Sequence, residues 1–119
     1  MIFPIQSKEK FTLANYMLQV TYTPAAMAAF VANPQNRIEA LKPVFKKLGG
    51  KMTQAWFAFG EYDIVGIMDL PDNVSAAAFS FAVTAGGAIK AIKTTPLMSV
   101  EEGIAAMKKA AEVSYKPPQ

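Results

Sequence analysis

The side chains best suited to chemistry lie in one short segment, Phe59-Gly60-Glu61-Tyr62-Asp63. It separates two apolar runs, so we predict a hairpin turn in which Gly60 adopts a positive φ. Glu61 or Asp63 could act as a general base beside Tyr62 if burial or a neighbouring charge raised the carboxyl pKa toward neutrality. The other interpretation, which we prefer, is structural: Glu61 is a solvated charge, and Asp63 accepts backbone N–H bonds that fix the hairpin register.

Aromatic side chains on the flanking strands could form a binding site whose mouth is this turn. Such a cavity would suit a small apolar or aromatic ligand, since aromatic walls bury much apolar area. It could also serve a cofactor-independent monooxygenase or isomerase, in which Tyr and Asp or Glu move protons in a desolvated pocket. The residues predicted to line the cavity are Tyr16, Tyr22, Trp56 and Phe57.

The composition excludes several classes of site. The chain of 119 residues has no cysteine and no histidine, which excludes thiol nucleophiles, histidine-ligated metals and His-based catalytic triads. We therefore expect no metal and no cofactor. The net charge is only +3, and Arg37 is the single arginine, whereas proteins usually bind nucleic-acid phosphates through several arginines. A nucleic-acid partner is not expected.

Neither a secretory signal nor a membrane span is expected. The first residues lack a basic start and a long apolar stretch, and the charge-free run over residues 73–89 contains Ser, Thr and Gly and is too short for a bilayer. The sequence thus predicts a cytoplasmic protein that does not bind membranes. We divide the chain into an N-terminal extension (1–13), one domain (14–113) and a flexible tail (114–119) whose prolines cannot continue a helix.

Hydrophobic periodicity predicts four strands in the domain. An alternation of period two, rich in β-branched and aromatic residues, is typical of a strand. We assign Met52, Gln54 and Trp56 to one face of the second strand and Phe57 to the other. Pro96 is expected to end the last strand, because proline cannot donate to the ladder. The predicted strands cover residues 16–22, 51–59, 64–70 and 88–95.

Four helices are predicted between and after these strands, over residues 25–32, 34–48, 74–85 and 100–113. Asn33 is the expected N-cap of the second helix, and Pro43 must kink or break that helix because it has no N–H. Ser99 and Glu102 have the spacing of a capping box at the start of the last helix.

The order of these elements predicts an α+β fold. Two interlocked β-α-β units with right-handed crossovers give a ferredoxin-like βαββαβ sandwich, in which helices cover one face of a four-stranded antiparallel sheet. The last helix is an addition to this fold. Strands 16–22 and 64–70 are expected at the centre, and the outer strands carry Lys51, Lys90 and Lys93 as protection for exposed edges.

Two surfaces look too apolar to face water. In the third strand Ile64, Gly66 and Met68 point to one face and Val65 and Ile67 to the other, so neither face is polar. The helix over 74–85 also has almost no polar side, which is typical of a buried helix. We therefore expect the open sheet face to pack on a second copy of the chain.

The helix over 74–85 is expected to contact a partner subunit as well. We assign one apolar stripe to the domain core and the remaining apolar residues to the partner, so that Phe79→Glu should abolish the native assembly. The inward stripe is Val74, Ala77, Ala78, Phe81 and Ala85, and the outward residues are Ala76, Phe79, Ala82 and Val83.

The turn and three further segments resemble the GYD-domain family of small bacterial and archaeal proteins, over residues 14–110. Here a glutamate stands between the glycine and the tyrosine of the turn. The resemblance implies the dimeric α/β-barrel type of assembly, in which two ferredoxin-like sheets face each other, and it implies no substrate. The apolar strand faces, the aromatic residues and the lack of reactive side chains lead us to expect a self-associating small-molecule-binding or assembly module. The further segments are Ala55-Trp56-Phe57-Ala58-Phe59, Pro71-Asp72-Asn73-Val74-Ser75 and Lys93-Thr94-Thr95-Pro96-Leu97.

Overall fold

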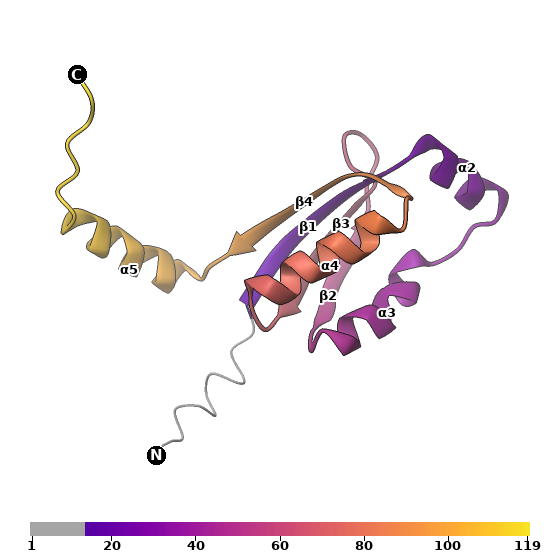
Figure 1. Cartoon of the computed structure of the whole chain (residues 1–119), viewed down its shortest axis with the longest axis horizontal. Coiled ribbons are helices and arrows are strands. Elements are labelled where there is room, and N and C mark those ends of the chain that lie inside the picture. Colours follow the sequence, from indigo (N-terminus) through magenta and orange to yellow (C-terminus); the bar gives the residue numbers. More distant parts are fainter. Residues whose placement is uncertain (1–13) are drawn as a thin grey trace, which may run out of the picture.

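The computed structural model describes residues 14–119 and has an antiparallel sheet of four strands with four helices (Figure 1). The strand order β2-β3-β1-β4 is that of a ferredoxin-like fold, and the predicted fold class is confirmed. The predicted extension over residues 1–13 lies outside the described residues. The elements are β1 (Ala14–Tyr22), α2 (Pro24–Ala32), α3 (Arg37–Lys47), β2 (Lys51–Phe57), β3 (Ile64–Leu70), α4 (Asn73–Ala85), β4 (Ile89–Leu97) and α5 (Val100–Ala111).

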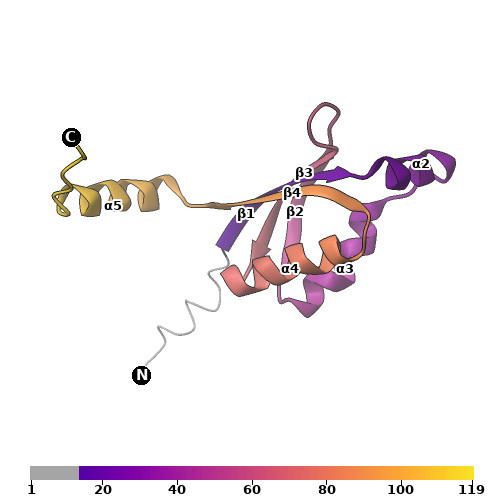
Figure 2. The same ribbon diagram turned by 45° about the horizontal axis from the view of Figure 1, so that its top comes forward.

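The core lies between the sheet and helices α3 and α4, which both lie on one side of it (Figure 2). Strands β1 and β3 supply most of the buried sheet residues, as expected of the two central strands. Every second residue of β1 and β3 is buried, and these residues face each other in register. The facing pairs are Tyr16 with Met68, Leu18 with Gly66 and Val20 with Ile64.

Helix α4 packs through a different face from the one predicted. Phe79 is 1% exposed and stacks on Phe45 of α3 with ring centroids 4.6 Å apart, whereas Val74 and Phe81 are 79% and 72% exposed. The proposed role of Phe79 as a partner contact is therefore wrong. At the first turn of α4, Asp72 caps the Ser75 N–H at 2.8 Å, and Tyr16 of β1 donates to Asn73 Oδ1 at 2.8 Å.

Helix α3 starts later than predicted. Its N-cap is Asn36, whose Oδ1 accepts from the N–H groups of Ile38 and Glu39, so Asn33 does not cap it. Of the two predicted effects of Pro43, a kink or a break, the break does not occur, because α3 is one helix from Arg37 to Lys47. Pro43 and Glu39 are both exposed, so water can bond the Glu39 carbonyl that Pro43 leaves free.

In the outer strands, β2 and β4, the last residue differs from the prediction, and in β2 the residues on each face differ as well. Strand β2 ends at Phe57 and contains a bulge between Met52 and Gln54, which separates these two residues onto opposite faces. Trp56 therefore lies on the open face opposite Val65. Strand β4 continues through Pro96, since an edge strand needs no N–H on its outer side.

Helix α5 extends away from the rest of the domain, in line with the end of β4 (Figures 1 and 2). Its predicted capping box is confirmed: Ser99 Oγ accepts from the Glu102 N–H at 3.0 Å, and Glu102 Oε1 accepts from the Ser99 N–H at 2.8 Å. The helix ends at Ala111, and none of its residues is buried. It is thus a formed helix without packing on its own domain.

Candidate functional site

The candidate site is an apolar cavity of about 430 Å³ between the sheet and helices α2, α3 and α4. We call it the main cavity. Its floor is formed by the buried face of the sheet, and its walls by small and aromatic residues of the helices. Only a few polar side chains reach it, among them Gln35 and Arg37. Its apolar lining includes Leu18, Val20, Ile64 and Ile89 from the sheet, Ala26, Ala29 and Phe30 from α2, Ile38 and Leu41 from α3, and Phe79, Ala82 and Val83 from α4.

A second cavity of about 480 Å³ adjoins the first, and we call it the outer cavity. The two share Tyr22, Phe30, Gln35 and Arg37 as a common wall. The far side of the outer cavity is formed by the segment that follows β2, together with Asp63 and with residues of α2. The hairpin turn therefore borders the outer cavity, and residues of three helices line the main one.

Tyr22 stands in the wall between the two cavities. Its ring contacts Phe30 edge to face, with centroids 4.9 Å apart and planes at 83°. Burial raises the pKa of the Tyr22 hydroxyl; the nearby Arg37 guanidinium opposes this rise, and the Asp63 carboxylate adds to it. The phenol is therefore neutral at physiological pH and can donate a hydrogen bond to a bound molecule.

Asp63 fastens the turn to the central strand β1. Its Oδ2 accepts from the Tyr22 N–H at 2.9 Å, and its own N–H donates to the Val20 carbonyl at 2.8 Å. Thr21 Oγ1 donates to the Glu61 carbonyl at 2.7 Å. Gly60 has the expected positive φ, 136°. One Asp63 oxygen is thus held by the backbone, although the residue still borders the outer cavity.

Arg37 supplies the positive charge of the site. It is the first residue of α3, and its Nη1 donates to Gln35 Oε1 at 3.0 Å. In residues 14–119 the salt bridge found is between Lys42 and Glu39, so no carboxylate of this part of the chain pairs with Arg37. Arg37 therefore lines both cavities, and its guanidinium has donors that Gln35 does not use.

The seven residues predicted for the site are only partly brought together. Tyr22, Phe57 and Asp63 line the outer cavity, and Phe57 also lines a groove of about 600 Å³ with Trp56. Glu61 is exposed, Tyr62 is half-buried, and neither lines the two cavities of the site.

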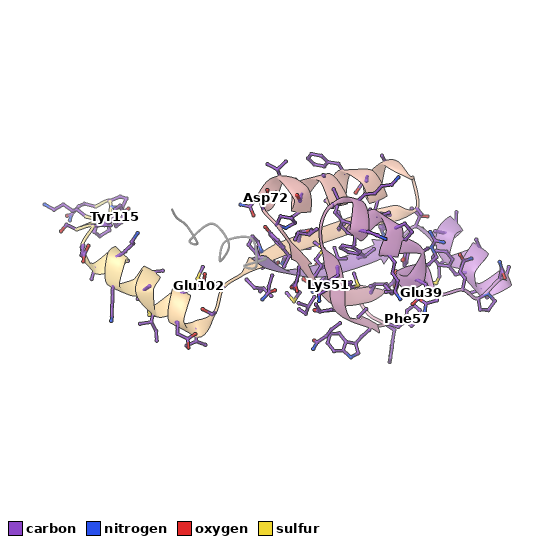
Figure 3. All side chains as sticks on the ribbon, turned by 90° about the horizontal axis from the view of Figure 1, so that it is seen from below. Glu39, Lys51, Phe57, Asp72, Glu102 and Tyr115 are labelled. Atoms are coloured by element: carbon purple, nitrogen blue, oxygen red, sulfur yellow. The ribbon has the colours of Figure 1, made fainter. Side chains whose placement is uncertain are left out.

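Tyr16 lies apart from the other predicted aromatic residues. It is 2% exposed, it lines a separate cavity of about 300 Å³, and burial together with the negative charge of Asp72 raises the pKa of its hydroxyl. Figure 3 shows Asp72, next to the Tyr16 partner Asn73, well separated from Phe57. The single aromatic cavity predicted from the sequence is therefore divided between several places.

Sequence reasoning missed Arg37 and Phe30. The signal available in the sequence is that Arg37 is the only arginine of the chain. Over residues 14–119, no three His, Cys, Asp or Glu side chains gather in a way that could hold a metal ion. In the same range no helix has the length and apolar character needed to cross a membrane.

Comparison with known proteins places these features in a family. Residues 16–107 match the family model described as the GYD domain, which covers both cavities and most of α5. No protein of curated function matches the chain. The match covers well over half of the sequence and includes the turn that borders the outer cavity. The chain therefore belongs to the GYD-domain family.

Proposed function

We propose that the protein is a self-associating module that binds a small apolar or aromatic molecule carrying an acidic group. The observation that supports this proposal most directly is Arg37, a guanidinium without a carboxylate partner in residues 14–119, on the wall of an apolar cavity. The apolar walls would bury the body of the ligand, and Arg37 would fix its acidic end.

The dimensions and the chemistry of the main cavity support this ligand class. Its volume of about 430 Å³ lies within the roughly 300–1,000 Å³ range of small-molecule sites. A hydrogen bond to a charged group contributes about 1.5–3 kcal/mol, more than a neutral one. The neutral Tyr22 hydroxyl is a second donor in the same wall. Together these donors favour an anionic head group over a cationic one.

Two naphthalene probes test the ligand class. We expect 1-anilinonaphthalene-8-sulfonate, which carries an anionic group, to bind in the main cavity, and N-phenyl-1-naphthylamine, which lacks that group, to bind more weakly. Arg37→Gln should weaken binding of the sulfonate about tenfold, equivalent to about 1.4 kcal/mol, and leave the neutral probe within twofold. Fluorescence titration measures both constants. If Arg37→Gln weakened binding of both probes equally, Arg37 would not be the residue that recognises the anionic group.

A matched pair of variants on α2 tests the place of binding. Ala29 lines the main cavity and Ala28 does not, although both are exposed residues of the same helix. Ala29→Leu should reduce binding of both probes at least about tenfold by filling the cavity, and Ala28→Leu should not. Unchanged binding in Ala29→Leu would place the probes elsewhere, for example on the open sheet face.

The open sheet face supports the self-association. No helix of the described chain covers it (Figure 2), and its apolar residues include side chains that are 55% and 41% exposed, Trp56 and Leu97. We infer that a second copy covers this face, as in the dimeric α/β-barrel arrangement that the resemblance to the GYD-domain family implies. The open-face residues are Met17, Trp56, Val65, Ile67 and Leu97.

A cofactor-independent monooxygenase or isomerase is the second candidate function. The observation in its favour is that Tyr22 and Asp63 border the same cavity, so that a neutral phenol and a carboxylate could act on one substrate. In that case Asp63→Asn would abolish turnover while leaving probe binding unchanged. Glu61, being exposed and outside both cavities, has no part in this candidate mechanism. A cytoplasmic location stays a prediction.

A further inference from the structure

Helix α5 presents an apolar stripe that its own domain does not cover. Val100, Ile104, Met107 and Ala111 follow one another at intervals of four, three and four residues, which places them on one side of the helix. The first three are 77%, 47% and 71% exposed. We call these four residues the α5 stripe. Figure 3 shows Glu102 and Tyr115 on the part of the chain that projects away from the sheet and its helices.

This helix is preformed but needs a partner. Only Met98 separates β4 from the N-cap Ser99, so the connection is too short for α5 to reach the helix layer on the other side of the sheet. An isolated helix of 12 residues is marginal in water, since most helical stability in proteins comes from packing of an apolar face.

We propose that the α5 stripe packs against the α5 stripe of a second copy, with the two helices antiparallel about a two-fold axis. The intervals of four and three residues are those of a helix–helix seam. A two-fold axis between Ile104 and Met107 places each of these residues against the other kind on the partner, which fills the seam evenly. Val100 then lies opposite Ala111 at both ends.

The charges beside the stripe select the antiparallel arrangement. Glu101 and Lys108 are seven residues apart and therefore lie on the same flank of α5. In an antiparallel pair Glu101 faces the partner's Lys108, and Lys108 faces the partner's Glu101, so two ion pairs form. In a parallel pair this flank would face the partner's other flank, which carries Gly103 and Ala110, so neither ion pair would form.

The other flank of the stripe allows the two helices to approach closely. It carries Gly103 and Ala110, which have no side chain beyond a methyl group. A Cβ added at Gly103 would meet no atom within 4 Å, so space for a neighbouring helix is open there. Small residues on one flank and complementary charges on the other give the pair a single favoured register.

Charge reversal tests this pairing because the interface is symmetric. Glu101→Lys and Lys108→Glu should each raise the dissociation constant of the assembly about tenfold at low salt, since both ion pairs become repulsive. Mixing the two variants should restore assembly, because each ion pair then forms with exchanged partners. The double variant E101K/K108E should also assemble like the unmodified chain. Sedimentation equilibrium measures each constant.

Lys109→Glu is the matched control for Lys108→Glu. It makes the same change of charge one residue away, on the side of α5 opposite the stripe, and should leave the dissociation constant within twofold. Equal effects of the two substitutions would overturn the proposal. The proposal would also be overturned if Glu101→Lys and Lys108→Glu each weakened assembly and a mixture of the two variants did not restore it. That result would indicate that α5 docks on another part of the partner.

Disulfide formation gives a second test that does not depend on charge. The chain has no cysteine, so introduced ones report only the designed contact. Mixed Ile104→Cys and Met107→Cys chains should form a cross-linked pair under mild oxidation, while each variant alone should form little. Cross-linking of each variant to itself, without the mixed product, would indicate parallel helices and contradict the proposal.

Discussion

Phe79→Ala is expected to lower the free energy of unfolding by about 3–5 kcal/mol. Phe79 is 1% exposed and stacks on Phe45, so its removal deletes both buried area and an aromatic contact. The space left would join the main cavity, which Phe79 already lines, and the surrounding helices cannot close it without moving. Urea unfolding followed by circular dichroism measures the change.

Phe81→Ala is the control for this prediction. Phe81 lies two residues further along α4 and is 72% exposed, so its removal should change stability by less than about 0.5 kcal/mol. A large loss in Phe81→Ala together with a small one in Phe79→Ala would show that α4 packs with the face predicted from the sequence.

Gly50→Ala is expected to destabilise the domain by about 3 kcal/mol, at the upper end of the usual range for overpacking. Its Cβ would overlap the backbone carbonyl oxygen of Asp69 and lie 2.7 Å from Leu70 Cδ2. Leu70 is 0% exposed and cannot turn aside, and the Gly50 N–H is held by the Phe45 carbonyl at 3.0 Å. The loop between α3 and β2 would have to move away from β3.

Thermal unfolding measures the effect of Gly50→Ala, with Gly86→Ala as its control. A Cβ at Gly86 would lie 3.4 Å from the Val83 carbonyl oxygen, an ordinary contact, and the backbone there is helical. We expect a fall in the melting temperature of about 10 °C or more for the first variant and little change for the second. Equal melting temperatures would show that the loop is not held against β3.

The sequence patterns that predicted the fold are those with a strong period and a clear end. The alternation in β1 and β3 identified the central strands, and the Ser99–Glu102 spacing identified the start of α5. Both depend on local geometry that a short segment determines by itself, which is why no tertiary information was needed.

The errors arose where local patterns were ambiguous. In α4 apolar residues occur on every side, so periodicity did not distinguish the face that packs on the core, which is the face of Ala76 and Phe79. Asn33 and Asn36 could each cap α3, and only the chain path decides between them. The bulge in β2 adds one residue, and strict alternation cannot anticipate it.

The candidate site could be predicted in part. The turn lies at the end of the sheet where three of the predicted residues, Tyr22, Phe57 and Asp63, border one cavity. Tyr16 could not belong there, because six residues of strand separate it from Tyr22 by about 20 Å. Arg37 reaches the site from a helix start that is distant in sequence from the turn, so only the tertiary structure brings them together.

The most direct test of the account is the mass of the full chain in solution. We expect sedimentation equilibrium at about 1–100 µM to give the mass of a dimer or a larger assembly. This result requires a dissociation constant between copies that is micromolar or lower. Ile67→Lys, which places a charge in the middle of the open sheet face, should give a folded monomer with an unchanged circular dichroism spectrum. A well-folded monomer of the unmodified chain over the whole concentration range would contradict the claim that copies of this protein cover each other's open faces.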